Sequence, residues 1–298
     1  AVGTAAIALL IMFPAAFFAG MTLPLFTSAL LKAGAGERAI GRVYAWNTLG
    51  AITGVLLAVH VLIPMFGVSL SVTAAAMVDA AIGLVLLRLL SPGRWAPGVA
   101  VAAVVLVAVF ASSLRFGQLD PRAQASGVFR TGSAEITAGA DVIFLQDGKT
   151  ATVSATAIGN EQVNISTNGK PDASMVTFDQ APTSDEITMI MAGALPLALK
   201  PQAERVGIIG WGSGLTTHTV LGLPSVREVN TIEIEPAMWE GAKVFGSRVA
   251  RAYEDPRSQV RFDDARTYFA AGAQKYDVII SEPSNPWVAG VAGLFTKE

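Results

Sequence analysis

Three acidic residues and a run of glycines in this chain are spaced so that they could bind a ligand and take part in a reaction. Gly210, Gly212 and Gly214 directly follow a short apolar run and precede a predicted helix. Alternating glycines after a buried strand allow a tight turn and a close backbone approach to a ligand, while the helix N-terminus points donors into the crevice. Glu233 lies 23 residues after Gly210, at the end of a second predicted strand. An acid in that place is typical of hydrogen bonding to both ribose hydroxyls of an adenosine-type ligand.

Two more predicted strands end in acidic residues. Residues 258–262 lead into Asp264, and residues 276–280 lead into Glu282. Because the carboxyl ends of parallel strands meet at one edge of a sheet, we expect Glu233, Asp264 and Glu282 to line the same crevice. The alternatives are purely structural: Asp264 could cap the helix that follows it, and Glu282 could be a solvated acid in a loop.

The elements around these residues indicate two soluble domains. Strands alternating with helices predict a Rossmann-like α/β domain with a parallel sheet over residues 181–298, opened by the capping box Thr183-Ser-Asp-Glu186. Upstream, residues 141–180 show a period of two and an Asn168-Gly169 turn, the strongest short hairpin signal. These residues predict a small antiparallel β domain.

The front of the chain has the composition of a membrane protein. The whole chain is 52% hydrophobic and only 15% charged, against an average of roughly 25% charged in soluble proteins. Residues 1–115 predict a transmembrane helical region, and residues 116–140 read as a linker. Helices of ~20 apolar residues cross a bilayer, and about four such spans are predicted: 2–31, with a kink or a break expected at Pro14 and Pro24, then 43–63, 68–87 and 97–114.

Two features inside the predicted spans could be structural or functional. Gly50 and Gly54 lie one turn apart, which favours close helix packing over a ligand site. Asp79 lies in the middle of a span, where an unpaired carboxylate is costly. Either a hydrogen bond inside the helix bundle or a role in transport or proton handling would explain it.

The two halves of the chain have opposite net charges, and the basic residues give conflicting indications of which side of the membrane each loop occupies. Residues 1–119 hold six Lys/Arg and two Asp/Glu, a net charge of +4, whereas the remainder carries a net charge of −6. Basic residues in the first and third loops place those loops in the cytoplasm, but Arg115, Arg122 and Arg130 after the fourth span favour the opposite orientation. We expect a multi-pass membrane protein, and the charges leave the side of the soluble part open.

Composition also excludes several classes of function. The acidic back half is a poor match to nucleic-acid phosphates, which require clustered Lys/Arg. The absence of cysteine excludes disulfides and thiolate chemistry. His60 and His218, the two histidines, fall in different predicted domains, so we expect no metal site.

The chain resembles the spermidine synthase family, and more narrowly the bacterial proteins in which a multi-span membrane region is fused to a spermidine synthase-like domain. The similarity is strong from residue 181 to residue 296. The residues that carry it are Gly207-Ile-Ile-Gly-Trp-Gly-Ser-Gly214, Ile232-Glu-Ile-Glu235, Asp255-Pro-Arg257, Asp264-Ala265, Tyr276-Asp-Val-Ile-Ile280 and, in the membrane region, Gly41-Arg-Val-Tyr-Ala-Trp-Asn-Thr-Leu-Gly50.

This resemblance implies a donor of the S-adenosylmethionine type, usually the decarboxylated form, and an amine or other small-molecule acceptor. Glu233 would hold the ribose, Asp264 the adenine amino group, and Glu282 would be the catalytic anion that deprotonates the acceptor ammonium. The implied donor-binding residues are Gly210, Gly212, Ser213, Gly214, Glu233, Asp264 and Ala265, and the implied acceptor-binding residues are Ser284 and Asn285.

Several positions depart from the family pattern, mostly on the acceptor side. Ser213 and Asn285 each stand where the family has an Asp, and Met189-Ile-Met191 replaces a polar run. Thr150-Ala151 replaces a Tyr-Gln pair. A dicationic acceptor without counter-charges would lose several kcal/mol of pairing, so the acceptor need not be a diamine.

Two other functions fit the same residues. The glycine run and the acid ending the second strand suit a methyltransferase using ordinary S-adenosylmethionine, and a transport or sensing protein could bind a nucleoside without turnover. We also expect the α/β domain to be truncated at the C-terminus, since only four strands are predicted. The missing part, or a second copy of the chain in a homo-oligomer, would then cover the sheet edge.

Overall fold

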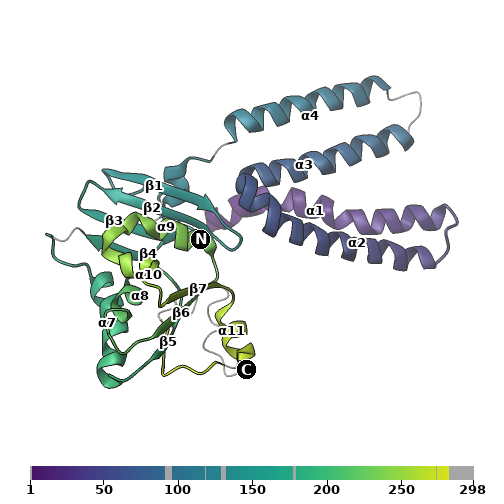
Figure 1. The fold of residues 1–298 in the computed structure, drawn as a ribbon. Helices are drawn as coiled ribbons and strands as arrows, with labels where there is room; N and C mark the ends of the chain where they lie inside the picture. The colour runs from purple at the N-terminus through teal and green to yellow at the C-terminus, as the bar shows by residue number, and fades with distance from the viewer. Residues whose placement is uncertain are drawn as a thin grey trace. The chain divides into compact units, whose positions relative to one another are not determined.

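The computed structural model describes residues 2–90, 96–117, 119–128, 132–176, 179–272 and 274–281. Residues 1–61 and 62–298 form two compact units, which are described separately. Figure 1 shows the long helices, an antiparallel sheet and a parallel sheet. The helices are α1 (Val2–Lys32), α2 (Arg38–Leu57), η1 (Ala58–Leu62), α3 (Ile63–Leu90), α4 (Ala96–Phe116), α5 (Pro121–Ala125), α7 (Ser184–Leu199), α8 (Leu215–Val220), α9 (Pro236–Gly241), η2 (Ala242–Val249), α10 (Ala250–Glu254) and α11 (Ala265–Ala271); the strands are β1 (Ala140–Asp147), β2 (Thr152–Ile158), β3 (Gln162–Thr167), β4 (Lys170–Val176), β5 (Arg205–Ile209), β6 (Glu228–Glu233), β7 (Ser258–Phe262) and β8 (Val278–Ser281).

The apolar front of the chain is helical. Three helical stretches are long and apolar enough to cross a membrane, namely Ala5–Lys32, Arg38–Leu89 and Pro97–Arg115. The second stretch is 52 residues long and includes Gly67, whose φ of 75° and ψ of 170° are not helical. At 1.5 Å per residue its length exceeds twice a hydrocarbon core of about 30 Å. Two of the four predicted spans therefore fall within this one stretch, one on each side of Gly67.

Two expectations about the apolar helices are modified by the structure. Of the kink or break expected in the first span, the break does not occur, because helix α1 continues through Pro14 and Pro24; a proline inside a helix can produce a kink without ending it. Asp79 lies exposed on α3 and has no hydrogen-bond or ion-pair partner among the residues that the structure describes.

The predicted β domain is a four-stranded antiparallel sheet in the order β1-β2-β3-β4. The predicted turn between β3 and β4 is confirmed: Asn168 has a φ of 49° and Gly169 a φ of 73°, the positive values that an Asn-Gly hairpin turn requires. The buried side chains of this sheet, among them Val153 and Ile165, join those of η2 and α9 in one apolar cluster. The antiparallel sheet thus shares a core with the α/β part of the chain.

The second sheet is parallel, in the order β7-β6-β5-β8. Its four strands agree with the predicted ones, and the predicted capping box is confirmed because Thr183 accepts from the backbone N–H of Glu186 while the Glu186 side chain accepts from that of Thr183. A second apolar cluster buries Val206 and Ile208 of β5, Val229 of β6 and Ile280 of the edge strand β8. This core holds the strand ends in a fixed arrangement.

His218 on α8 should make the stability of this region depend on pH. The backbone N–H of Arg251 donates to its Nδ1 at 3.2 Å, and Arg251 Nη1 lies 3.2 Å from its Nε2. Burial, followed by the charge of Arg251, holds the pKa of His218 below its usual 6.5. Since the unfolded chain then binds the additional proton more readily, the free energy of unfolding should rise with pH up to about 6.5 and level off above it.

The measurement is the unfolding midpoint of the full chain in detergent between pH 5 and pH 8. His218→Asn is the matched variant, and its midpoint should lack this increase while sharing every other pH effect with the wild type. Parallel curves for the two proteins would contradict the assignment to His218.

Candidate active site at the carboxyl edge of the parallel sheet

Backbone hydrogen bonds join the carboxyl ends of three neighbouring strands. The N–H of Gly210, just after β5, donates to Ile232 O of β6 at 2.9 Å. The N–H of Asp263, just after β7, donates to Glu233 O at 3.1 Å. The structure therefore brings the glycine run, Glu233 and Asp264 to one edge of the sheet, as the sequence predicts.

The glycine loop presents open backbone at this edge. Gly210 has a φ of 89° and Gly212 a φ of 54°, and a Cβ added to either residue would meet no atom within 4 Å. Only glycine adopts such angles without cost. Both residues therefore leave room beside the main chain for a ligand to approach.

Trp211, between these two glycines, anchors the loop in the core. Its indole is buried, and its Nε1 donates to the Tyr253 hydroxyl at 3.1 Å. That hydroxyl donates in turn to Trp239 O at 2.8 Å. Burial raises the pKa of Tyr253 above its usual range, which keeps the hydroxyl protonated as a donor. The large side chain of the loop thus points away from the open glycine backbone.

Glu233 ties the glycine loop to the end of β6. Its Oε2 accepts from the N–H of Trp211 at 2.7 Å, and its Oε1 accepts from the N–H of Glu235 at 2.8 Å. Glu233 as a whole residue is only 7% exposed. Burial raises its pKa, and the nearby Glu235 carboxylate adds to that increase, while the backbone hydrogen bonds oppose it. A carboxylate oxygen has a second acceptor site, so Glu233 can hold the loop and still accept from a ligand.

Ser213 and Asp264 have local hydrogen-bonding partners. The Ser213 hydroxyl is fully buried, donates to Met189 Sδ at 3.1 Å and accepts from the N–H of Leu215 at 3.2 Å, so its side chain faces α7 and not the crevice. Asp264 Oδ1 accepts from the N–H of Thr267 at 2.8 Å and caps α11. The capping alternative for Asp264 therefore holds for one oxygen, and its other oxygen keeps its acceptor sites.

Of the remaining predicted site residues, one lies within the described part of the chain and three lie outside it. Ala265 is buried at the start of α11. Glu282, Ser284 and Asn285 lie outside the residues that the structure describes, directly after β8. Among the described residues, no group of three His, Cys, Asp or Glu side chains is arranged to hold a metal ion.

Glu235 is a site residue to which the sequence analysis assigned no role. It is 4% exposed and caps α9, because its Oε1 accepts from the N–H of Ala237 at 3.0 Å. The signal was present in the sequence, since an acid followed by Pro236 is typical of a helix start with proline in the first turn. Its contacts with the β1–β2 loop involve residues more than 80 positions away and had no local signal.

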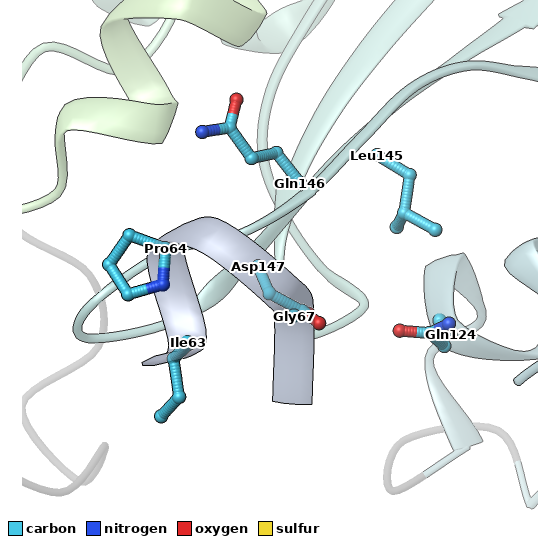
Figure 2. A pocket seen from close by; sticks show the side chains of 7 residues that line it. All are labelled: Ile63, Pro64, Gly67, Gln124, Leu145, Gln146 and Asp147. Carbon is cyan, nitrogen blue, oxygen red and sulfur yellow. The ribbon is translucent and has the colours of Figure 1, made fainter. Parts of the chain in front are cut away.

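A separate cavity of about 280 Å³ lies beside the end of β1. Figure 2 shows the residues that line it, which are Ile63, Pro64, Gly67, Gln124, Leu145, Gln146 and Asp147. Asp147 Oδ2 accepts from the N–H of Val68 at 2.8 Å, and its Oδ1 accepts from the Thr152 hydroxyl at 2.6 Å. None of the lining residues belongs to the parallel sheet, so this cavity is distinct from the candidate site.

Known proteins match the part of the chain that holds this edge. Residues 185–298 match the spermine/spermidine synthase domain family. The polyamine aminopropyltransferase of Bacillus subtilis is 33% identical over 107 residues, and that of Agathobacter rectalis is 32% identical over 108 residues; each match covers 36% of this chain and 38% of the relative. The matched segment thus spans well under half of the length of these relatives.

Solved spermidine synthase structures are similar to about half of this chain, at low sequence identity. A spermidine synthase in complex with the transition-state analogue AdoDATO is 22% identical with a TM-score of 0.45, covering 52% of this chain and 50% of the other. The Thermotoga maritima spermidine synthase is 21% identical with a TM-score of 0.40, covering 47% of each chain. On the family match and the sequence identities, the chain carries a spermidine synthase-like domain over residues 185–298.

Proposed function

We propose that this protein is a membrane-anchored aminopropyltransferase that moves an aminopropyl group from decarboxylated S-adenosylmethionine to an amine. One observation carries the proposal. The glycine loop has open backbone at Gly210 and Gly212, and Glu233 holds it at the carboxyl edge of a parallel sheet by accepting from the N–H of Trp211, within a segment about a third identical to polyamine aminopropyltransferases. In open α/β sheets, ligands bind outside this edge.

The donor would use the groups that the described strands bring together. Glu233 would accept hydrogen bonds from the ribose hydroxyls through its remaining acceptor sites, and Asp264 would accept from the adenine amino group. The backbone of the glycine loop would lie beside the part of the donor around the sulfonium. Because Glu233 also holds the Trp211 N–H, the ribose contact and the loop position depend on the same carboxylate.

The chemistry then requires a neutral amine. The acceptor arrives as an ammonium ion, and Glu282 takes one of its protons. The nitrogen lone pair attacks the methylene carbon next to the sulfonium, so that a C–N bond forms while the C–S bond breaks with its electron pair on sulfur. The products are the aminopropylated amine, as an ammonium ion, and neutral methylthioadenosine. Ser284 and Asn285 would contact the acceptor.

We propose a membrane location, supported by the apolar helices and by the supply of the donor. Anchoring in a bilayer is supported by the three long apolar stretches Ala5–Lys32, Arg38–Leu89 and Pro97–Arg115. In a bacterium this bilayer would be the inner membrane. The donor is made inside cells, which supports a cytoplasmic position for the candidate site.

Calorimetric titration of the full chain in detergent, with each sulfonium separately, tests the ligand class. We expect the decarboxylated form to bind more tightly, followed by transfer to an amine in a coupled assay. Tighter binding of carboxylated S-adenosylmethionine would instead indicate a methyltransferase. Failure of both sulfoniums to bind would overturn the proposal.

A further inference from the structure

The first compact unit, residues 1–61, contains a pocket that the proposed reaction does not use. Helices α1 and α2 lie side by side (Figure 1), and a pocket of about 560 Å³ lies between them. Leu23, Phe26 and Leu30 of α1 and Val43 of α2 form its apolar walls, and Ala35 of the joining loop also borders it. A pocket of this size holds a small molecule or one end of a longer one.

Arg42 gives this apolar pocket a positive charge. It lines the pocket from α2, is exposed, and has no ion-pair or hydrogen-bond partner among the residues that the structure describes. Lys32 and Arg38 flank the same loop, and Glu37 is the one acidic residue in the sequence of residues 1–61. A guanidinium donates several N–H groups in a fork that matches phosphate oxygens. The charge of the pocket is therefore complementary to an anion.

The polar side chains of the pocket lie at the depth of a bilayer interface. A stretch apolar enough to cross a membrane begins at Arg38. At 1.5 Å per residue, Arg42 lies about 6 Å along the helix from this start and Asn47 about 14 Å, while a headgroup layer is about 5–8 Å thick. Trp46 also lines the pocket and is 72% exposed, and tryptophan is enriched at membrane interfaces. Arg42 is thus placed at headgroup depth, with the apolar walls at the depth of acyl chains.

We propose that this pocket binds an anionic phospholipid, with the lipid phosphate on Arg42 and one acyl chain between the apolar walls. The side-chain amide of Asn47 and the indole N–H of Trp46 have no partner within the described part of the chain, and both are donors suited to the ester carbonyls of the lipid. A zwitterionic lipid fits less well, because its own cation offsets the attraction to the basic residues. The inference rests on the proposed membrane anchoring and is independent of the transfer reaction.

Lipid titration of the full chain in detergent, followed by native mass spectrometry, tests the ligand class. Dioleoylphosphatidylglycerol should bind at least tenfold more tightly than dioleoylphosphatidylcholine. Arg42→Gln should lower the affinity for phosphatidylglycerol at least tenfold, because it removes a direct charge-assisted contact, whereas Arg42→Lys keeps the charge and should lower it less than about threefold.

Arg38→Gln is the matched control for this titration. It makes the same charge change one helical turn away, outside the pocket, and should lower the affinity by no more than about threefold. Equal losses in Arg42→Gln and Arg38→Gln would overturn the site, since they would show a general attraction between basic residues and anionic lipid. Equal binding of the two lipids by the wild type would overturn the anionic ligand class.

Cysteine labelling locates the bound lipid, because the chain contains no cysteine of its own. Ala35→Cys places a single thiol at the border of the pocket, and Ala33→Cys places one in the same loop outside it. Saturating phosphatidylglycerol should slow maleimide labelling of Ala35→Cys at least fivefold and leave that of Ala33→Cys within twofold. Glycerol phosphate, the headgroup chemistry without acyl chains, should slow neither.

Three labelling results would overturn the proposal. Unchanged labelling of Ala35→Cys while the lipid binds would place the lipid elsewhere. A thiol at position 35 that is unreactive without lipid would show that another part of the chain, or a second copy, fills the pocket. Slowing by glycerol phosphate would make free phosphate the occupant. A chain that stays monodisperse without detergent would overturn the membrane anchoring itself. None of these measurements uses transfer activity, so failure of the lipid site and failure of the proposed reaction are distinguished.

Discussion

Glu282→Gln is expected to slow aminopropyl transfer by about 10²- to 10⁴-fold, the usual contribution of a general base. Glutamine has nearly the shape of glutamate but cannot take the proton of the acceptor ammonium, so the attacking nitrogen would keep its lone pair bound to that proton. Donor affinity should stay within about twofold, because the proposed donor contacts come from Glu233, Asp264 and the glycine loop. Single-turnover rates and calorimetric donor titrations measure the two quantities separately.

The control for this variant is Glu161→Gln, an exposed acid in the turn between β2 and β3. It carries the same charge change and should transfer at the wild-type rate. If Glu282→Gln also turns over at the wild-type rate, Glu282 has no part in the mechanism. An equal loss of donor affinity and rate would move Glu282 from the acceptor side to the donor side.

Arg248→Met is expected to lower the free energy of unfolding by about 3–5 kcal/mol, the usual cost of leaving one member of a buried ion pair unpaired. Glu186 is fully buried and ion-paired with Arg248, and it also accepts from the N–H groups of Val176 and Thr183. Arg248 Nη1 donates to Val176 O as well. The pair therefore joins η2, α7 and the end of β4.

Unfolding of the full chain in detergent measures this loss of free energy, if it is followed by a spectroscopic signal from the part of the chain that contains the two sheets. Glu186→Gln combined with Arg248→Met should recover part of the loss, because no unpaired charge is then buried. Arg227→Met is the control. This substitution breaks the ion pair between Arg227 and Glu204, whose side chains are 75% and 50% exposed respectively. It should lower the free energy of unfolding by less than about 1 kcal/mol. Equal losses in Arg248→Met and Arg227→Met would show that the buried pair contributes no more than a surface pair.

Features that depend on neighbouring residues could be predicted from the sequence. The strands follow from runs of apolar and alternating residues, the capping box from Thr183 and Glu186, and the hairpin turn from Asn168-Gly169, all of which the structure contains. The meeting of Glu233 and Asp264 at one edge also follows, because parallel strands bring their carboxyl ends together.

Side-chain directions and distant contacts needed the folded chain. Ser213 occurs in a ligand-binding pattern, but packing against Met189 turns its hydroxyl into the core. The pairing of Glu186 with Arg248 joins residues 62 positions apart.

By itself the sequence determined the order of the elements, the glycine loop and the acids at the strand ends, since hydrogen bonding within a few residues and the period of apolar residues dictate them. Only the tertiary structure decided that Glu235 holds the loop around Gly148, across 85 positions. That contact exists because the antiparallel sheet shares one core with α9 and η2, and a linear pattern carries no signal of which distant backbone groups a buried carboxylate will meet.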